Sequence, residues 1–311
     1  MYPLKMMPVF KDNIWGGKRL KEEYGKNTPY EITGESWEVA SHKNGESTVG
    51  NGEYAGKTIK ELTSLLKESF LGDKVYMGDE EKFPLLVKFI DAKESLSVQV
   101  HPDDDFAREN ENGELGKTEM WYIMDASDGA GILYGFKEEI TKDEFKESIE
   151  NNTLLDYTYF AKCKKGDSFF IPAGTLHAIG EGILIAEIQQ NSDTTYRVYD
   201  YNRKDANGNT RELHIEKAVE VTDLCPAKTL KKANDNVIAD CEYFKVEKLV
   251  VNNSLKWTVD KSRFEIIIVC DGKVRINGIE FKKGETALIP AYIGEIELIG
   301  DAEILKTYVN V

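Results

Sequence analysis

Residues 164–173 read KKGDSFFIPA, and residues 282–291 read KKGETALIPA. Both segments begin with Lys-Lys-Gly and an acidic residue, and after three further residues both end in Ile-Pro-Ala. A glycine turn that leads into a short apolar run closed by proline is typical of a β-strand whose end needs no ladder donor. The repeat predicts two related antiparallel β-barrels in tandem, although two unrelated hairpins of an all-β protein can share such a pattern by coincidence.

Strand-like segments dominate the chain around the first copy of the repeat. They are short, rich in β-branched and aromatic residues, and bounded by Gly, Asp or Asn: Leu85–Ile90, Leu96–His101, Met120–Met124, Ser168–Ile171, Ile183–Gln189 and Tyr196–Tyr201. Apolar periodicity and capping residues predict three helices: Thr58–Phe70, Thr141–Ile149 and Leu213–Leu224. Because these helices do not alternate with the strands, we predict a mainly β, antiparallel fold rather than a parallel sheet with crossover helices.

A polar, lysine-rich segment separates the two copies of the repeat. Residues 225–240 read CPAKTLKKANDNVIAD, which is typical of an inter-domain connection. We therefore predict an N-terminal barrel domain with the helical segments over residues 1–232 and a smaller, all-strand domain over residues 233–311.

Charge and cysteine content narrow the class of protein. The formal net charge of −15 argues against binding to nucleic acid or to an anionic membrane surface. No stretch approaches the ~18 apolar residues of a membrane-spanning helix, and the N-terminal MYPLKMMPVF has no continuous apolar region typical of a signal peptide. Since the four cysteines form no C-x-x-C pair, we expect free thiols and a cytoplasmic protein.

One constellation of side chains points to a metal ion. Gln99 and His101 are two residues apart on a predicted strand, so both side chains face one side, into the barrel. Glu119 begins the next strand and His177 follows a glycine turn, which adds a carboxylate and a second imidazole. Two imidazoles and a carboxylate suit zinc and other first-row divalent ions. The alternative is that both histidines are hydrogen-bonded structural residues, as we expect for His42 and His214.

The repeat confines this predicted metal site to the N-terminal barrel. His177 lies five residues after the proline of the first copy, and Glu295 occupies the equivalent position in the second copy. The predicted C-terminal domain contains no histidine at all.

A second polar cluster follows at residues 187–203. Glu187 shares a strand face with Gln189, while Arg197 and Arg203 add cations whose planar donors suit phosphate or an enediolate oxygen. Lys117 lies two residues before Glu119. The alternative for each of these cations is a solvated surface side chain paired with one of the many carboxylates.

Four motifs carry a resemblance to a known family: SVQVHPDD, GKTEMWYI, PAGTLHAIG and EIQQNSDTTYRVYDYNR. With these motifs, and with Trp15-Gly16-Gly17 and Glu35-Ser36-Trp37 upstream, the chain resembles type I mannose-6-phosphate isomerase in its short bacterial form. That family consists of metal-dependent enzymes of the cupin superfamily. The resemblance implies two tandem cupin-type (jelly-roll) barrels and reversible conversion of mannose 6-phosphate into fructose 6-phosphate, by proton transfer between C2 and C1 through an enediol.

The resemblance also implies roles for individual residues. One Zn²⁺ per chain is expected on Gln99, His101, Glu119 and His177. Arg197, Lys117 and Glu187 match catalytic positions, Glu187 as the base, and Ser97 and Arg203 match positions near the substrate phosphate. Thr194 stands where the family has asparagine, two residues after Ser192.

Two other functions are compatible with a metal site in the N-terminal barrel. A metal-dependent oxygenase would use two histidines and a carboxylate, but Gln99 and the Arg197 segment argue against it. A sugar-phosphate-binding or regulatory cupin without turnover is the non-enzymatic alternative, and the retained ligand set argues against it. The expected partner is a small sugar phosphate, without nucleic acid or membrane, and the expected assembly is a monomer or homodimer.

Overall fold

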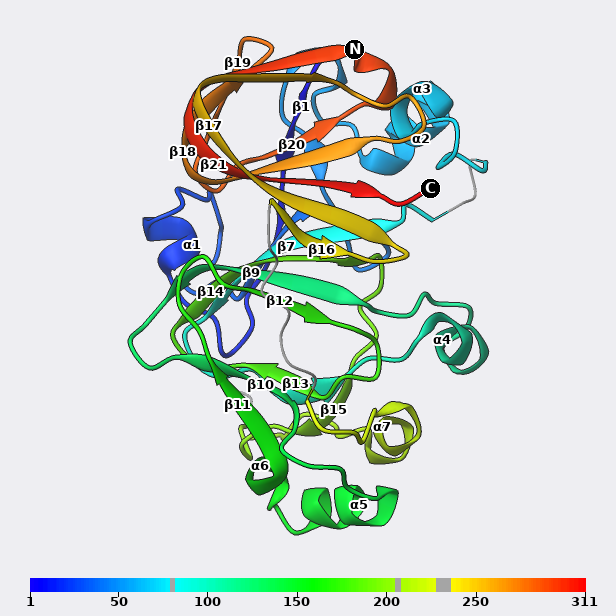
Figure 1. Ribbon diagram of the computed structural model, residues 1–311, viewed down its shortest axis with the longest axis vertical. Coiled ribbons are helices and arrows are strands. Elements are labelled where there is room, and N and C mark those ends of the chain that lie inside the picture. Colours follow the sequence, from blue (N-terminus) through cyan, green and yellow to red (C-terminus); the bar gives the residue numbers. More distant parts are fainter. Residues whose placement is uncertain (79–81, 205–207, 228–235) are drawn as a thin grey trace.

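The computed structural model describes residues 1–78, 82–204, 208–227 and 236–311. Strands make up 43% of the chain and helices 16%, so the prediction of a mainly β fold is confirmed. The strands form layers that run across the molecule, and most of the helices lie at its edges (Figure 1). No helix within the described ranges is long and apolar enough to cross a membrane.

The central layer is a six-stranded antiparallel sheet. Its strands are, in spatial order, β12 (Ser168–Ile171), β9 (Glu119–Ala126), β14 (Ile183–Gln190), β7 (Leu85–Ala92), β3 (Glu35–Val39) and β2 (Val9–Lys11). Every residue of β7 and β14 is buried. A strand that is buried on both faces needs a neighbouring layer on each side.

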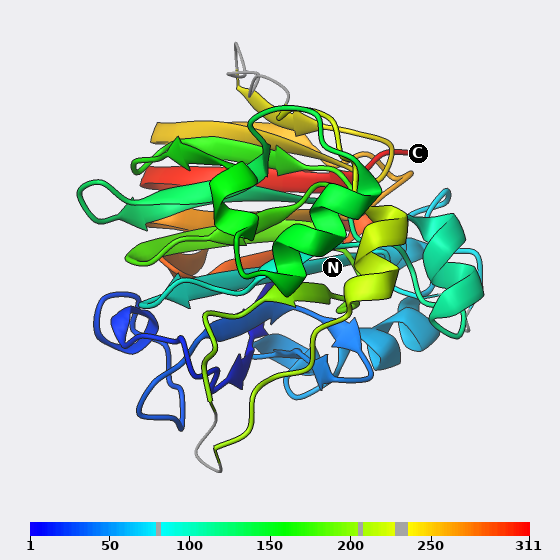
Figure 2. The same ribbon diagram turned by 90° about the horizontal axis from the view of Figure 1, so that it is seen from below.

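The second layer is a five-stranded antiparallel sheet. Its spatial order is β11 (Thr158–Lys162), β10 (Gly131–Phe136), β13 (His177–Ile179), β8 (Val98–Val100) and β15 (Tyr196–Tyr199). Val98 and Val100 pack in one apolar cluster with Phe145 of α5 (Lys142–Glu150) and Ala218 of α7 (Ile215–Val221). Figure 2 shows these helices lying over the strands. Because side chains alternate along a strand, Gln99 faces the opposite side, towards the central sheet.

The third layer contains the C-terminal strands. Its spatial order is β16 (Val237–Asp240), β17 (Phe244–Thr258), β21 (Glu295–Val309), β18 (Glu265–Ile276), β20 (Thr286–Ile289), β1 (Leu4–Met7) and β6 (Thr48–Val49), with β19 (Ile279–Lys282) paired to β18. The short hairpin β4 (Ser41–His42) and β5 (Gly45–Glu46) stands apart. The N-terminal strand β1 thus joins the sheet of the C-terminal strands through β20.

The alternation of side chains explains how the central sheet separates the two other layers. From β7, Val87 and Phe89 join the apolar cluster shared with Phe244 and Phe264 of the C-terminal part. Lys88 lies between them in sequence and therefore points to the other side, into the space between the central and five-stranded sheets. The candidate site residues Gln99, Lys117 and Glu187 line the same space.

The two copies of the repeat have the same local structure. In each copy the backbone N–H of the acidic residue donates to the carbonyl of the first lysine, Asp167 to Lys164 at 3.1 Å and Glu285 to Lys282 at 2.9 Å. Each acidic side chain also accepts from the backbone N–H of that lysine, at 2.9 Å in both copies. The segments continue as β12, paired with β9, and as β20, paired with β18. The repeat therefore marks two equivalent strand–turn units.

The predicted helices form with differences at their ends. Thr141 caps α5 through a capping box with Glu144, as its sequence suggests. The predicted helix 58–70 is two helices, α2 (Ile59–Leu66) and α3 (Glu68–Leu71), because Lys67 between them has a φ of 50°, which interrupts the helical ladder. The predicted helix 213–224 is shorter, as α7. The sequence analysis missed the short helices α1 (Arg19–Glu22), α4 (Asp104–Asn110) and α6 (Leu154–Tyr157) and two 3₁₀ turns, Gly52–Tyr54 and Ala291–Ile293.

The predicted inter-domain connection, residues 225–240, lies partly outside the described residues, which omit 228–235 and with them the predicted boundary at 232. Its last four residues are strand β16, so the predicted end of the connection is wrong. Val237 and Ala239 of β16 are register partners of residues of β17, so this strand extends the third layer. The division into two domains stays a prediction.

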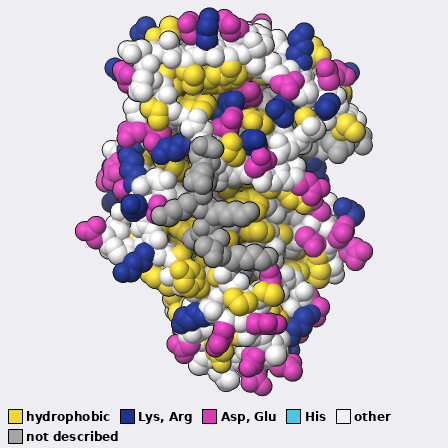
Figure 3. All heavy atoms as spheres, in the orientation of Figure 1, with side chains coloured by type: hydrophobic (Ala, Val, Ile, Leu, Met, Phe, Trp, Pro, Cys, Tyr) yellow, Lys and Arg dark blue, Asp and Glu magenta, His cyan; other side chains and the backbone are white. Residues whose placement is uncertain are grey.

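The state of the cysteines and the distribution of surface charge agree with the expectations from composition. Cys163, Cys241 and Cys270 are free thiols. On the face shown in Figure 3, acidic and basic side chains are interspersed, and no broad basic area appears among the described residues there.

Candidate active site

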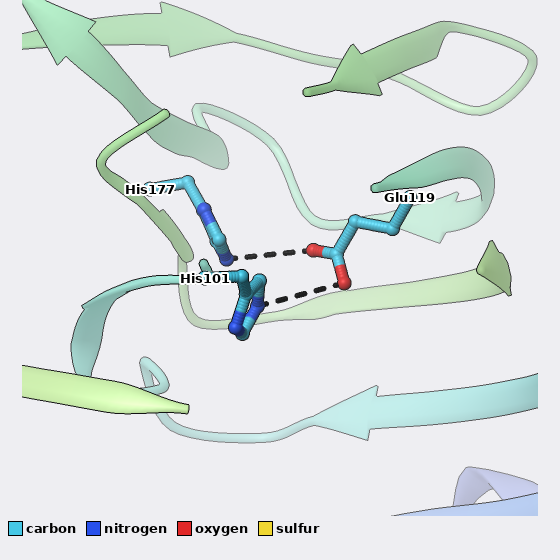
Figure 4. Close-up of side chains that lie close together, drawn as sticks. All are labelled: His101, Glu119 and His177. Atoms are coloured by element: carbon cyan, nitrogen blue, oxygen red, sulfur yellow. Dashed lines mark ion pairs between the residues drawn. The ribbon is translucent and has the colours of Figure 1, made fainter. Parts of the chain in front are cut away.

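Three buried side chains meet between the central and five-stranded sheets. His177 begins β13, His101 follows β8, and Glu119 begins β9 of the facing sheet. The Nε2 atom of His177 lies 3.4 Å from Glu119 Oε1, and the Nε2 atom of His101 lies 3.6 Å from Glu119 Oε2 (Figure 4). The ligand atoms of the three residues all lie within 4.8 Å of one another. Chain segments distant in sequence thus form one compact cluster.

The imidazole rings are held in the form that can bind a metal. His101 Nδ1 lies 2.9 Å from the carbonyl of Thr194, and His177 Nδ1 lies 2.8 Å from the carbonyl of Thr175. A carbonyl only accepts, so each Nδ1 carries the proton and each Nε2 presents a lone pair. Burial lowers the pKa of His101 well below its usual range and that of His177 to about 4, so both rings are neutral near pH 7.

The residues of this cluster fit a cation. His101 Nε2 and both oxygens of Glu119 have no hydrogen-bond donor within the described part of the chain, although they are buried. Lone pairs that face one another in this way repel unless a positive charge lies between them. Lys117 supplies part of that charge, since its Nζ lies 3.3 Å from Glu119 Oε2. The lone pair of the His101 imidazole remains unmatched, and divalent first-row ions are the species that two imidazoles and a carboxylate bind.

Gln99 lies beside this cluster. It is the register partner of His177 on one side and of Arg197 on the other. Its Nε2 lies 3.4 Å from His177 Nε2, and its Oε1 accepts from Ser97 Oγ at 3.4 Å. A half-turn of the amide would exchange these atoms and direct the oxygen at the cluster. The position agrees with the predicted fourth ligand, which stays a prediction.

A cavity of about 360 Å³ extends from Gln99 towards the surface. Its walls include residues that the sequence analysis selected, namely Ser97, Gln99, Lys117, Glu187 and Arg197. They also include residues that it did not select for a role: Lys11, Asn13, Trp15, Glu35, Trp37, Lys88 and Arg211.

Glu187 is held as a buried carboxylate. Trp121 Nε1 donates to its Oε2 at 2.9 Å, and Lys88 Nζ lies 3.2 Å from its Oε1. Burial raises the pKa of Glu187, but the charges of Lys88 and Lys117 outweigh burial and hold the pKa below the usual value. Burial likewise lowers the pKa of Lys88, and the carboxylates of Glu187 and Glu35 outweigh that effect and raise it. Both groups are therefore charged at neutral pH.

A cluster of arginines lies at one side of the cavity. Arg203 and Arg211 both donate to Asp200 Oδ1 at 2.6 Å. Arg197 donates to Ser97 Oγ at 3.2 Å and to the carbonyl of Glu212 at 3.1 Å, and no carboxylate of the described chain forms an ion pair with it. Burial and the charge of Arg211 lower the pKa of Arg197. Three guanidinium groups around one carboxylate leave an excess of positive charge in an acidic protein.

Arg203 does not line the cavity, unlike Ser97 and Arg197. Its Nη1 donates to the carbonyl of Ser95 at 2.7 Å, and its Nη2 binds Asp200. Its predicted contact with the substrate phosphate stays a prediction from the resemblance alone. His42 and His214 lie outside the cluster: His42 Nδ1 accepts from the backbone of Asn44, and His214 Nδ1 accepts from the backbone of Arg197.

Three of the missed residues had a signal in the sequence. Lys88 is the single cation in LLVKFIDA, a strand buried along its whole length, and a buried charge in such a run indicates a paired or functional group. Glu35 and Trp37 lie two residues apart on β3, and the indole of Trp37 donates to Glu35 Oε2 at 2.6 Å. Arg211 had no such signal, because its surroundings are polar and resemble an ordinary surface loop.

Two family models and several known proteins are similar to this chain. Residues 3–124 match the family model "Phosphomannose isomerase type I, catalytic domain", and residues 234–309 match "Mannose-6-phosphate isomerase, cupin domain". The chain is 43% identical to the mannose-6-phosphate isomerase ManA of Bacillus subtilis, over 98% of each chain. It is 40% identical to the mannose-6-phosphate isomerase of Streptococcus mutans, over 99% of this chain and 98% of that one. The crystal structure of the Bacillus subtilis mannose 6-phosphate isomerase is similar, with a TM-score of 0.89 and 39% identity over 99% of each chain.

Proposed function

The chain belongs to the type I phosphomannose isomerase family, and from this premise we propose that it is a metal-dependent isomerase that interconverts mannose 6-phosphate and fructose 6-phosphate. The observation that carries the proposal is the buried cluster of His101, Glu119 and His177, which lies beside a cavity lined by Glu187, Lys117 and Arg197. The cluster is suited to a divalent cation, and the cavity walls offer a base and two cations beside it.

The ion that we propose is Zn²⁺, one per chain, on His101, Glu119 and His177 with Gln99 as a fourth ligand. A bound divalent ion supplies Lewis-acid polarisation of a carbonyl oxygen and holds substrate hydroxyls in place. Neutral imidazoles and a carboxylate are ordinary ligands for zinc, and cobalt or manganese accept the same set.

Glu187 is the proposed base that moves the proton between C2 and C1. Its carboxylate lines the cavity, is ionised at neutral pH, and is oriented by Trp121 and Lys88. A positioned base typically contributes ~10²–10⁴-fold to such a step. The low pKa of Glu187 favours the ionised form, which is the form that accepts the proton from carbon.

Arg197 and Lys117 are the proposed electrostatic partners of the enediolate. Removing a proton next to a carbonyl places negative charge on oxygen, and a fixed cation in a buried site stabilises that charge without reorganisation. Ser97 and the carbonyl of Glu212 hold the Arg197 guanidinium in place, and Glu119 holds Lys117.

The substrate phosphate is proposed to bind towards the arginine cluster. Arg211 lines the cavity and is fixed by Asp200, so it presents a rigid donor at the side away from the base. Ser97 donates to Gln99 and accepts from Arg197, and its contact with the phosphate is part of the proposal. Remote binding of phosphate of this kind holds the reacting carbons in position.

Three further features belong to the proposal. The central and five-stranded sheets would form one jelly-roll barrel of the cupin type, and the C-terminal strands a second, smaller one without a metal site; the equivalent turns of the repeat support this. A cytoplasmic location is supported by the free thiols. A monomer or homodimer is the proposed assembly.

A coupled assay tests the proposal. The purified chain is incubated with mannose 6-phosphate, and fructose 6-phosphate is measured alongside oxygen consumption. Turnover to fructose 6-phosphate without oxygen uptake is the expected result. Binding of mannose 6-phosphate without turnover would identify a regulatory protein, and oxygen uptake with bound iron would identify an oxygenase; either result would overturn the proposal.

A further inference from the structure

A second cavity, of about 780 Å³, lies on the outer side of the C-terminal sheet. One wall is the turn after α1, residues 23–25, and the other is formed by β18, β19 and the adjacent part of β21. In Figure 1 the helix α1 lies beneath the strands β18 and β19. The cavity shares no lining residue with the proposed active site, and nothing in the proposed function uses it.

Four cations line this cavity: Lys273, Arg275, Lys282 and Lys283. Within the described ranges, no carboxylate lies within ion-pair distance of any of them. The first copy of the repeat differs, because there Lys165 forms an ion pair with Asp271 at 3.0 Å. The Lys-Lys pair of the second copy thus keeps its charge available to a ligand.

Two of these cations are direct neighbours across the sheet. Lys273 of β18 is the register partner of Lys282 of β19. Like charges that stand opposite each other on a sheet destabilise the pair. An anion between them would remove that repulsion.

The two lysines of the repeat also reach the opposite wall. The Nζ of Lys283 lies 4.2 Å from the centre of the Tyr24 ring. The Nζ of Lys282 would lie 3.5 Å from a Cβ placed on Gly25, whose φ is +61°. Both ammonium groups therefore lie at the Tyr24–Gly25 turn.

Three acidic residues, Glu23, Glu280 and Asp301, line the same cavity. Against four cations they leave a net charge of +1, while the whole chain carries −15. Local charge at this cavity is thus opposite in sign to that of the molecule, as an anion-binding site requires.

We propose that this cavity binds a small anion that carries a diphosphate group. Neighbouring strands are ~5 Å apart, and residues two apart on a strand are ~6.6 Å apart. Four cations at these spacings span a wider area than a single phosphate group would occupy. Lysine ammonium groups bind phosphate as point charges, and Arg275 adds a planar fork of donors. Ile299, which is 53% exposed beside Arg275, offers an apolar contact for an organic part of the ligand.

Calorimetric titration of the full chain with inorganic pyrophosphate tests this proposal. Saturating mannose 6-phosphate is present throughout, so that pyrophosphate cannot report on the proposed active site. The double variant Lys273→Ala/Lys282→Ala is expected to lose affinity by on the order of tenfold or more, since it removes two charge-assisted contacts. The variant Asp301→Asn is expected to bind more tightly, because it removes a competing negative charge.

The matched control is Lys60→Ala/Lys142→Ala, which changes the net charge equally at exposed lysines away from the cavity. Turnover should be unchanged in both double variants, and neither should melt at a lower temperature than the unaltered chain, which shows that they fold. Absence of pyrophosphate binding at millimolar concentration, an equal loss of affinity in the control, or equally tight binding of inorganic phosphate would each overturn the proposal.

Discussion

Replacement of Arg197 by alanine should lower kcat while the metal cluster stays intact. The Arg197 side chain contacts Ser97 and the carbonyl of Glu212 but none of His101, Glu119 or His177. Its removal should therefore leave the metal content near its original value. Loss of one preorganised donor to a developing oxyanion costs ~10²–10³ in kcat, or ~2.7–4 kcal/mol.

The structure also predicts a smaller effect at the residue that holds this guanidinium. Ser97→Ala removes one of the two hydrogen bonds that fix Arg197, each with a net value of ~0.5–1.5 kcal/mol. Since ~1.4 kcal/mol corresponds to a factor of ten in rate, Ser97→Ala should reduce kcat by about tenfold at most. Arg197→Lys keeps the charge but loses the planar fork, so it should recover only part of the activity.

Steady-state kinetics and metal analysis of the same preparations check this prediction. If Arg197 acts at the reacting carbons, kcat and kcat/KM fall together while KM changes little. Arg108→Ala, an exposed arginine of α4, is the matched control and should leave both constants unchanged. An unchanged kcat in Arg197→Ala, or loss of the metal from that variant, would refute the reasoning.

Three further predictions concern other parts of the account. Glu187→Gln should abolish solvent-deuterium incorporation into the product and lower kcat by ~10²–10⁴, and incorporation at the original rate would exclude Glu187 as the base. Lys26→Met should destabilise the fold by ~3–5 kcal/mol in thermal unfolding, because the Nζ of Lys26 lies 2.6 Å from the buried Glu38 carboxylate. Adding Glu38→Gln should restore part of the lost stability. A double variant that is no more stable than Lys26→Met would contradict this prediction. Burial raises the pKa of Asp200, but the hydrogen bonds from Arg211 and Arg203 outweigh burial and lower the pKa. The ionised Asp200 therefore stabilises the fold at pH values above the usual aspartate pKa of about 4. That stabilisation is lost as the pH falls through the lower pKa of the folded state. In urea unfolding the stability difference between the unaltered chain and Asp200→Asn should therefore shrink on acidification, and a difference independent of pH would count against it.

Strand alternation was sufficient to predict part of the site. Gln99 lies on β8 and His101 directly follows that strand, and the valines that flank Gln99 pack against helices on the opposite face. The period of two in the sequence was therefore enough to direct both polar side chains inward. Periodicity does not say which strands face each other, so the meeting of His101 with Glu119 depended on the resemblance and became visible only in the structure.

Other features depended on tertiary structure alone. The predicted helix 58–70 has an unbroken apolar pattern, yet Lys67 adopts a positive φ and the chain turns so that Phe70 and Leu71 enter the core. Local propensity is a weak guide where burial of large side chains competes with it. The place of Arg211 could not be predicted from the sequence either, because only the fold brings this residue from a polar loop to the wall of the cavity that Arg197 also lines.

The central claim is that His101, Glu119 and His177 hold one divalent ion on which isomerisation depends. Metal analysis of purified His177→Ala, alongside its turnover of mannose 6-phosphate, tests this claim most directly, with His214→Ala as the control because His214 lies outside the cluster. We predict about one equivalent of metal in the unaltered chain and in His214→Ala, and loss of both metal and turnover in His177→Ala. Retention of metal and turnover by His177→Ala would contradict the account.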